Sequence, residues 1–219
     1  MKFIIYIVLL AMSSRVYAEI ERDDRIWLTY QADYSLSPQL KAMIQIQPYW
    51  RNEGSHRDQV TIRPGLYYQI TDRAFVGGGY AYNLGFNNNN QHTHEQRLWE
   101  DIGLTLFESN TYKVQERSRF EHRQFEHQGE ISTGLRQLLK VSVLLSPTYT
   151  AIISDEAYFN LNKTAQVQSG FDQNRLFLGV GRKILNATNL EVGYLNQYVA
   201  ISSPDRMNHV LAINISQSF

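Results

Sequence analysis

The chain lacks cysteine, lacks an excess of basic residues and lacks long apolar runs beyond its first residues. Without cysteine there is no disulfide framework and no lipid-anchoring cysteine of a lipoprotein. Lysine and arginine number 21 and aspartate and glutamate also 21, which argues against a nucleic-acid-binding protein. The mean hydropathy is negative, and no later stretch approaches the roughly 20 apolar residues of a spanning helix. A helical membrane protein is therefore excluded.

The first residues are typical of a secretory signal peptide. Lys2 provides a positive charge, residues 3–12 are apolar, and Val16 and Ala18 occupy the positions that a signal peptidase reads. The apolar run is too short to span a membrane as a helix. We predict cleavage after Ala18, which gives a signal peptide of residues 1–18 and one domain of residues 19–219. Cleavage would remove Lys2 and Arg15 and leave a formal charge of −2.

The rest of the chain alternates between apolar and polar residues in segments that are separated by turn signals. In the first segment, Ile26, Leu28 and Tyr30 share one face, and Gln31 and Asp33 share the other. The predicted strands are residues 26–35, 40–50, 59–70, 74–86, 96–109, 112–126, 130–145, 149–161, 172–184, 190–201 and 207–219. They exceed the five or six residues that are usual for strands of soluble proteins.

The connections between these segments alternate in length, which predicts a membrane barrel. Short turns lie near residues 35–39, 71–73, 109–111, 146–148 and 185–189, and longer or more polar ones lie near 51–58, 87–95, 126–130, 161–171 and 201–207. Short turns at one end and longer loops at the other are typical of outer-membrane barrels. We therefore predict an all-β fold, a transmembrane, antiparallel, up-and-down β-barrel.

The number of predicted segments is odd, whereas bacterial single-chain barrels have an even number of strands. A further strand in residues 19–25, or a division of residues 130–145 into two, would give twelve strands. A first segment tucked inside the barrel would leave ten. We favour twelve strands and keep ten as the alternative.

The last segment ends in an aromatic residue, and Leu211, Ile213, Ile215 and Phe219 share its apolar face. It resembles the closing strand of outer-membrane barrels, in which a terminal aromatic residue is the assembly signal. We predict that Phe219 is this signal and that the partners are outer-membrane lipid and the barrel-assembly machinery. The expected location is the cell outer membrane of a Gram-negative bacterium. We expect a monomer, because closure removes the free strand edges.

Charged side chains turn inward when the apolar faces are placed toward lipid. The densest group lies on residues 112–126, where Arg117, Arg119, Glu121 and Arg123 project to one side. The same alternation places Glu116 and His122 outward, toward lipid, unless a bulge resets it. The residues predicted to line the lumen or bind solute are Arg63, Arg97, Arg117, Arg119, Glu121, Arg123, Arg136, Lys140, Glu156 and Arg175.

Three functions are compatible with such an interior. The first is a structural or accessory barrel with a charged, largely filled lumen. The second is a narrow diffusion channel for small anionic solutes such as acidic oligosaccharides, since rings of Arg or Lys select anions. The third is an envelope lipid-modifying enzyme, which needs an activated Ser–His pair. No serine lies in a G-x-S-x-G context, and His92 and His94 are too weak a signal for a metal site. We assign no catalytic residue, metal or cofactor.

Several stretches are similar to a bacterial outer-membrane family known as domain of unknown function 2490. They are WLTY (27–30), RPGLYY (63–68), RSRFEHR (117–123), FDQNRLFLGVGRKI (171–184), LEVGYLNQY (190–198) and HVLAINI (209–215). The resemblance covers nearly the whole mature chain and implies an outer-membrane barrel without an activity. The positions that match the family and are expected to form a structural or lumenal network are Arg119, Glu121, Arg123, Asn174, Arg175, Tyr194 and Asn196.

Overall fold

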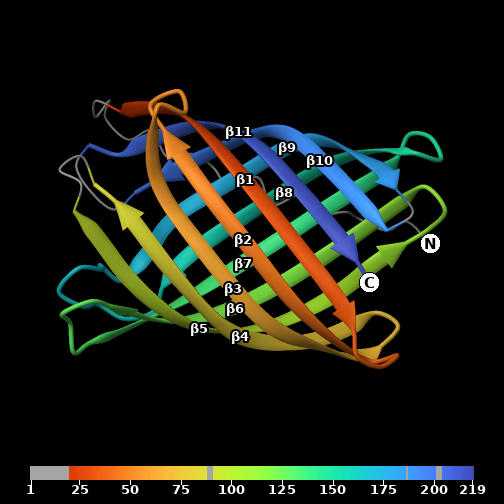
Figure 1. The fold of residues 1–219 in the computed structure, drawn as a ribbon, viewed down its shortest axis with the longest axis horizontal. Coiled ribbons are helices and arrows are strands. Elements are labelled where there is room, and N and C mark those ends of the chain that lie inside the picture. The colour runs from red at the N-terminus through yellow and green to blue at the C-terminus, as the bar shows by residue number, and fades with distance from the viewer. Residues whose placement is uncertain (1–19, 88–90, 186, 201–203) are drawn as a thin grey trace, which may run out of the picture.

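A computed structural model describes residues 20–87, 91–185, 187–200 and 204–219 (Figure 1). The predicted signal peptide and its cleavage site at Ala18 lie outside these residues. The strands of the described part are β1 (Glu21–Ser35), β2 (Leu40–Arg51), β3 (His56–Thr71), β4 (Ala74–Phe86), β5 (His92–Glu108), β6 (Tyr112–Phe125), β7 (Ile131–Leu144), β8 (Tyr149–Asn160), β9 (Gly170–Leu185), β10 (Thr188–Val199) and β11 (Arg206–Ser218). This part of the chain contains no helix of the length and apolarity that crossing a membrane requires.

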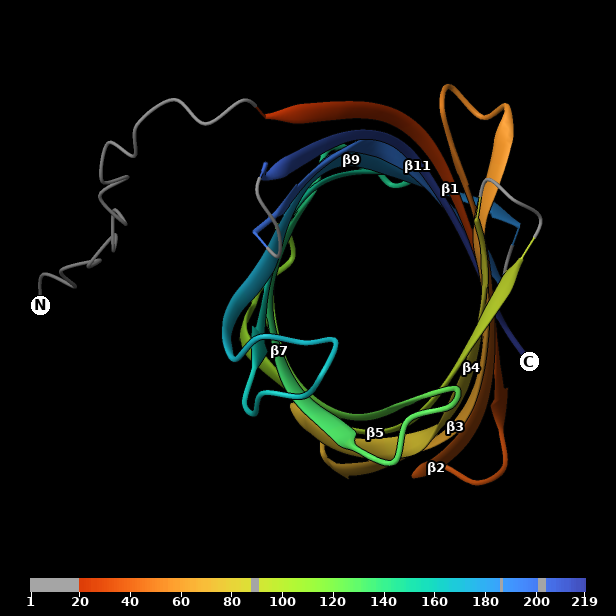
Figure 2. The ribbon, with the colours of Figure 1, turned by 90° about the vertical axis from the view of Figure 1, so that its left-hand side faces the viewer.

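The strands pair in sequence order and close into a ring (Figure 2). The pairs of consecutive strands are antiparallel. The closing pair is parallel and runs from Glu21 beside Arg206 to Asp33 beside Ser218. We call this pairing of β1 with β11 the parallel seam.

The predicted number of twelve strands, or ten, is wrong, because the described residues form a closed barrel of eleven. Residues 21–25 lengthen β1 and form no separate strand, and β7 stays undivided. The first segment belongs to the wall. Because an odd number of alternating strands leaves the first and the last running in the same direction, the closing pair is parallel, with Ile26 next to Leu211 and Leu28 next to Ile213. The prediction of an all-β barrel is confirmed. The predicted antiparallel pairing holds for consecutive strands, and the parallel seam is the exception to it.

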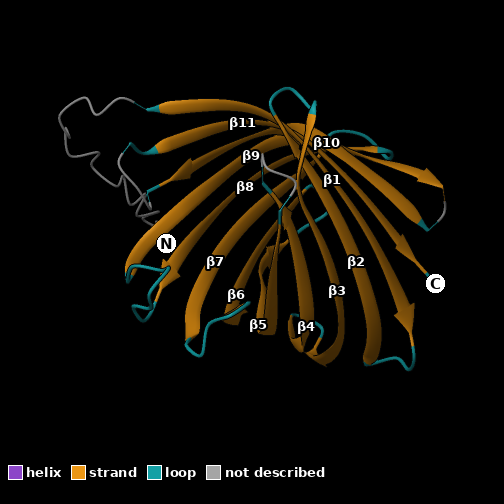
Figure 3. Ribbon diagram, turned by 60° about the vertical axis from the view of Figure 1, so that its left-hand side comes forward, coloured by secondary structure: helices purple, strands orange, loops and turns teal. Residues whose placement is uncertain are grey.

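The two ends of the barrel carry different connections (Figure 3). At one end, here the short-turn rim, the connections are residues 36–39, 72–73, 109–111, 145–148 and 186–187. At the other end, here the long-loop rim, they are residues 52–55, 87–91, 126–130, 161–169 and 200–205. The alternation of connection lengths that the sequence predicts is thus present, although residues 52–55 form a compact turn.

The polarity of the barrel is inverted relative to that of a soluble protein. Large apolar side chains cover the outside, and Leu98 is 61% exposed and Leu211 48% exposed. Charged side chains fill the inside, where Asp101 is 1% exposed and Arg119 is 2% exposed. Alternation along each strand produces this arrangement, because successive side chains point to opposite faces.

Two apolar clusters lie within the lumen, on opposite sides of the strand ring. The Trp99 cluster consists of Met43, Ala81 and Trp99, with Tyr67 packed against it. The Phe177 cluster consists of Ile152, Phe177 and Ala212, with Leu195 packed against it.

Each cluster covers a cross-strand pair of glycines. Gly65 pairs with Gly79 under the Trp99 ring, and Gly179 pairs with Gly193 under the Phe177 ring. A Cβ atom on Gly79 would lie 2.3 Å from the Pro64 carbonyl oxygen, and one on Gly193 would lie 2.3 Å from a backbone oxygen of β9. The absence of side chains at these pairs therefore makes room for a ring that fills part of the lumen.

Candidate functional site

Strand β6 carries the charged segment that the sequence singles out. Its odd-numbered residues Arg117, Arg119, Glu121 and Arg123 face the lumen, where Arg119 and Glu121 are buried. A bulge that resets the alternation of β6 is not present, because β6 pairs with β7 in unbroken register from Tyr112 to Gln124. The register shift in the β5–β6 pairing lies on β5, between Thr105 and Phe107. The outward carboxylate of Glu116 is instead satisfied on the outer wall by hydrogen bonds from Ser118, at 2.8 Å, and Gln137.

The most deeply buried ion pair joins Arg119 to Asp101. The Arg119 Nε and Nη2 atoms donate to the two carboxylate oxygens over 2.6 and 2.7 Å. The Tyr67 hydroxyl donates to the same carboxylate over 3.1 Å. The guanidinium also lies 4.6 Å from the centre of the Trp99 ring. A paired, fork-shaped contact of this kind fixes both direction and distance.

Arg136 connects two further carboxylates in the lumen. Its Nη1 atom donates to Glu121 over 2.8 Å, and its Nη2 atom donates to Glu156 over 2.9 Å. Arg117 donates to Glu156 over 2.6 Å, and Arg97 donates to Glu121 over 3.1 Å. Each carboxylate thus contacts more than one arginine.

Nearer the rims the charged residues form smaller groups. Arg123 donates to Glu95 over 2.6 Å, and Arg97 shares that carboxylate at 2.8 Å. Toward the short-turn rim, Lys140 donates to Glu191 over 2.8 Å. These pairs link strands of the wall and leave the lumen polar along its length.

Arg175 differs from these residues. Within the described part of the chain it forms no ion pair and no hydrogen bond, and its Nε atom is buried without a partner. Its guanidinium lies 4.7 Å from the centre of the Trp27 ring and 4.7 Å from that of the Tyr158 ring. Aromatic faces therefore hold this side chain in place of a carboxylate.

A continuous series of contacts crosses the lumen, and we call it the mid-lumen circuit. On one side, Trp27 stacks on Tyr49 at 4.4 Å and Arg175 lies between Trp27 and Tyr158. On the other, Arg63 donates to Gln45 over 2.7 Å and lies 3.8 Å from Glu121. Its members, in order, are Tyr49, Trp27, Arg175, Tyr158, Arg136, Glu121, Arg63 and Gln45.

Two cavities of about 370 Å³ each lie inside the barrel. The short-turn cavity reaches Lys140 and Glu191, and the long-loop cavity reaches Arg51 and Arg206. Residues common to both linings are Trp27, Gln47, Tyr49, Arg63, Arg136 and Arg175. Five of these six belong to the mid-lumen circuit or stack within it, and the circuit therefore lies at the boundary between the cavities.

All ten residues that the sequence predicts for the lumen line one or both cavities. Together the two linings hold eleven arginines and lysines against four aspartates and glutamates. Whether these residues bind a solute stays a prediction.

Sequence reasoning missed some lumenal residues. Arg25 and Arg206 line the long-loop cavity, but the predicted segments begin one residue after each of them. Trp27 and Tyr158 were not singled out, because an inward aromatic residue gives no charge signal. Register could have identified Tyr158. It lies opposite Gln173, two residues along β8 from Glu156, which is the cross-strand partner of Arg175, and it therefore shares the inward face.

The family-matching positions, expected to form a structural or lumenal network, divide between the two faces of the barrel wall. Arg175 points inward, and its neighbour Asn174 therefore points outward, where it donates to Asp155 over 2.7 Å. Tyr194 and Asn196 also face outward, with the Tyr194 hydroxyl 2.6 Å from His209 Nδ1. The reason is the two-residue period of a strand, which separates Asn174, Tyr194 and Asn196 from the lumenal group.

Neither a metal centre nor a hydrolase site is assembled among the described residues. They contain no group of three or more His, Cys, Asp or Glu side chains with the spacing of a metal site. Ser55 Oγ lies 2.8 Å from His56 Nδ1 on an exposed turn. No carboxylate in this part of the chain orients that imidazole, as an activated serine would need.

The fold and the site together define the class of this protein, which is a closed β-barrel with an apolar outer wall and an ion-paired lumen. The chain belongs to the family described as "Protein of unknown function (DUF2490)", whose model matches residues 24–208. An uncharacterised protein of Methylorubrum extorquens is 27% identical over 94% of this chain and 92% of its own. The solved translocator domain of the autotransporter NalP from Neisseria meningitidis is 13% identical, with a TM-score of 0.49 over 77% of this chain and 72% of that domain.

Proposed function

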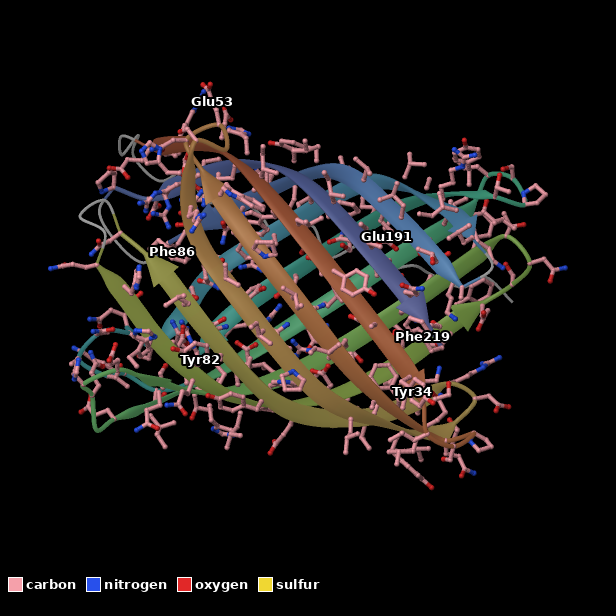
Figure 4. The ribbon with its side chains drawn as sticks, in the orientation of Figure 1. Tyr34, Glu53, Tyr82, Phe86, Glu191 and Phe219 are labelled. Atoms are coloured by element: carbon pink, nitrogen blue, oxygen red, sulfur yellow. The ribbon has the colours of Figure 1, made fainter. Side chains whose placement is uncertain are left out.

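We propose that the protein is an outer-membrane barrel of a Gram-negative bacterium. The inverted polarity supports this location, because an outward apolar wall is stable against lipid and a closed ring leaves no unpaired strand edge. Outward aromatic residues support it further. Near the short-turn rim they are Tyr34, Tyr68, Tyr112 and Tyr149, and toward the long-loop rim they include Tyr82, Phe86, Phe159 and Phe171 (Figure 4). Aromatic girdles at both interfaces are a feature of such barrels.

The location has a direct test in cells. After cell fractionation the protein is expected in the outer-membrane fraction, with an electrophoretic mobility that changes on heating. Recovery in the soluble periplasmic fraction would overturn the membrane proposal.

Inside the membrane the barrel serves a structural or accessory role, with a lumen that is closed at mid-height. One observation carries this conclusion, namely the mid-lumen circuit, which spans the lumen between β9 and β1 and between β6 and β3. Contacts that skip intervening strands narrow the space between the two cavities. Small barrels fill their interiors with side chains in this way.

Planar-bilayer recordings of the refolded protein test the closure. The wild-type barrel is expected to stay silent, and Trp27→Ala is expected to conduct, because it removes the ring between Tyr49 and Arg175. Trp50→Ala is the control, since Trp50 faces outward on β2, next to Tyr49. Steady openings of the wild-type barrel would overturn the closed lumen.

A second candidate function is a narrow channel for small anions. The two cavity linings hold eleven basic residues against four acidic ones, and this surplus of positive charge favours an anion channel. Rings of Arg or Lys select anions. If the wild-type barrel conducts, a reversal potential measured in a salt gradient must show anion preference. Cation preference would eliminate this candidate.

A further inference from the structure

Arg175 is the starting point, because the lumen leaves its hydrogen-bonding capacity unused. The neighbouring carboxylate of Glu156 already accepts from Arg117, Arg136 and the Tyr158 hydroxyl. Other lumenal arginines near mid-height lie within ion-pair distance of a carboxylate, namely Arg63, Arg97, Arg117, Arg119 and Arg136. Arg175 has none among the described residues, and only its Nε atom is fully enclosed. Its terminal Nη atoms therefore remain open to the cavities that it lines.

The two aromatic rings fix the orientation of this guanidinium. Trp27 on β1 and Tyr158 on β8 each lie 4.7 Å away by ring centre. Stacking of this kind occupies the faces of the guanidinium plane and leaves the N–H groups along its edge free to donate. A guanidinium edge presents parallel donors that match two oxygens of one carboxylate or phosphate group.

The surroundings of Arg175 on the long-loop side are strongly basic. The long-loop cavity is lined by eight arginines, while Asp58 and Glu121 are its acidic residues. Asp58 already contacts Arg25 at 2.7 Å, and Glu121 contacts Arg136 at 2.8 Å. Arg206, at the outer end of this cavity, forms no ion pair with a described residue. Glu156 lies opposite Arg175 across the ladder and is already bound by two other arginines. An anion that enters the cavity therefore meets two guanidinium groups that no described carboxylate contacts within ion-pair distance.

We propose that the long-loop cavity is a binding site for a small oxyanion, which the edge of Arg175 binds at the base of the cavity and Arg206 attracts near its entrance. The amides of Gln173 and Gln197 line the same cavity and provide further polar contacts. The site goes beyond the structural role, because it requires an open cavity on one side of the mid-lumen circuit and no passage through it.

Isothermal titration of the refolded barrel with inorganic phosphate, in chloride-containing buffer, tests the site. Saturable binding at one site is expected for the wild-type protein. Arg175→Gln is expected to weaken it by about tenfold or more, since a paired charge-assisted contact is lost. Arg182→Gln is the matched control on the same strand, because Arg182 is exposed and stacks on Tyr149 at the short-turn rim. This control is expected to bind phosphate as the wild-type protein does.

Arg175→Lys separates recognition of an oxyanion from attraction to charge. It keeps the positive charge and loses the two parallel N–H donors of the guanidinium edge. It is therefore expected to bind phosphate more weakly than the wild type. Arg206→Gln provides a second variant if Arg175→Gln does not fold, and it is also expected to weaken binding. Unchanged affinity in both Gln variants would overturn the proposal, as would the absence of saturable binding to the wild-type barrel. Neither result depends on conductance, so failure of the site and failure of the closed lumen remain distinguishable.

Discussion

The Trp99 cluster and the Phe177 cluster are built on the same plan on opposite walls of the lumen. In each, an aromatic ring covers two glycines that face each other across neighbouring strands. The difference lies in what the ring supports. The guanidinium of Arg119 lies on the Trp99 ring, and Asp101 binds that guanidinium. The Phe177 ring instead packs against aliphatic side chains.

The walls around the two clusters differ in the same sense. Beside the Trp99 cluster, β5 to β8 are joined through ion pairs. Beside the Phe177 cluster, a buried neutral pair joins β10 to β11, in which Asn208 donates to Gln197 over 2.8 Å. A charged contact, Lys140 with Glu191, lies farther toward the short-turn rim. The barrel can therefore fill its lumen with or without charge. Where it uses charge, removal of one partner leaves the other buried and unpaired, and this costs more than the loss of a neutral hydrogen bond.

The largest expected effect comes from Arg119→Gln, which removes the cation from the Trp99 cluster. Its side chain is 2% exposed and that of Asp101 is 0% exposed, so the carboxylate would remain buried without its ion-pair partner. We expect the free energy of unfolding to fall by about 3–5 kcal/mol. Reversible urea unfolding of the barrel in lipid vesicles measures this change.

The double variant Arg119→Gln with Asp101→Asn is the control for that prediction. It removes both charges, and we expect it to recover part of the lost stability, because no unpaired carboxylate remains. A double variant that is as unstable as the sum of the two single variants would contradict the coupling between these residues.

Gly79→Ala and Gly193→Ala test whether the two clusters share one plan. Each added Cβ atom would lie 2.3 Å from a backbone oxygen, and forced repacking of this kind costs about 1–3 kcal/mol. We expect similar losses in both, measured by the same unfolding assay. Gly129→Ala is the control, since a Cβ atom there would have no neighbour within 4 Å. A loss confined to one wall would show that the resemblance between the clusters is only apparent.

The smallest effect is expected for Arg123→Gln, at the edge of the charged wall. Arg123 is 20% exposed, and its partner Glu95 also contacts Arg97 at 2.8 Å. The carboxylate thus keeps a cation after the substitution. We expect a loss of about 1 kcal/mol in the unfolding assay, and a loss equal to that of Arg119→Gln would contradict the ranking by burial.

Local features of the sequence predicted much of the barrel. The segment 74–86 coincides with β4, and the two-residue period placed the arginines of β6 inward. The same period also requires Asn174 and Arg175 to face opposite sides of the wall. Grouping the family-matching positions into one expected network did not take this into account. Ion pairs between adjacent strands depend on which face each residue occupies and on which strands are consecutive. Both can be predicted from the sequence, and so can that part of the network.

Long-range pairings could not be predicted in the same way. The strand count depends on β1 meeting β11, and no local pattern distinguishes a parallel partner from an additional strand. The contact of Arg175 with Trp27 joins strands at opposite ends of the chain. Alternation predicts which face a residue occupies, but it does not predict which strand lies across the lumen. The mid-lumen circuit can therefore be identified only in the closed barrel.

The parallel seam has a topological consequence. A barrel with an even number of antiparallel strands finishes at the rim where it began. Here β1 begins with Glu21 beside Arg206 at the long-loop rim, and β11 finishes with Ser218 beside Asp33 at the short-turn rim. Short epitopes fused ahead of Glu21 and behind Phe219 are therefore expected to lie at opposite ends of the barrel, which under the proposed outer-membrane location means on opposite sides of the bilayer.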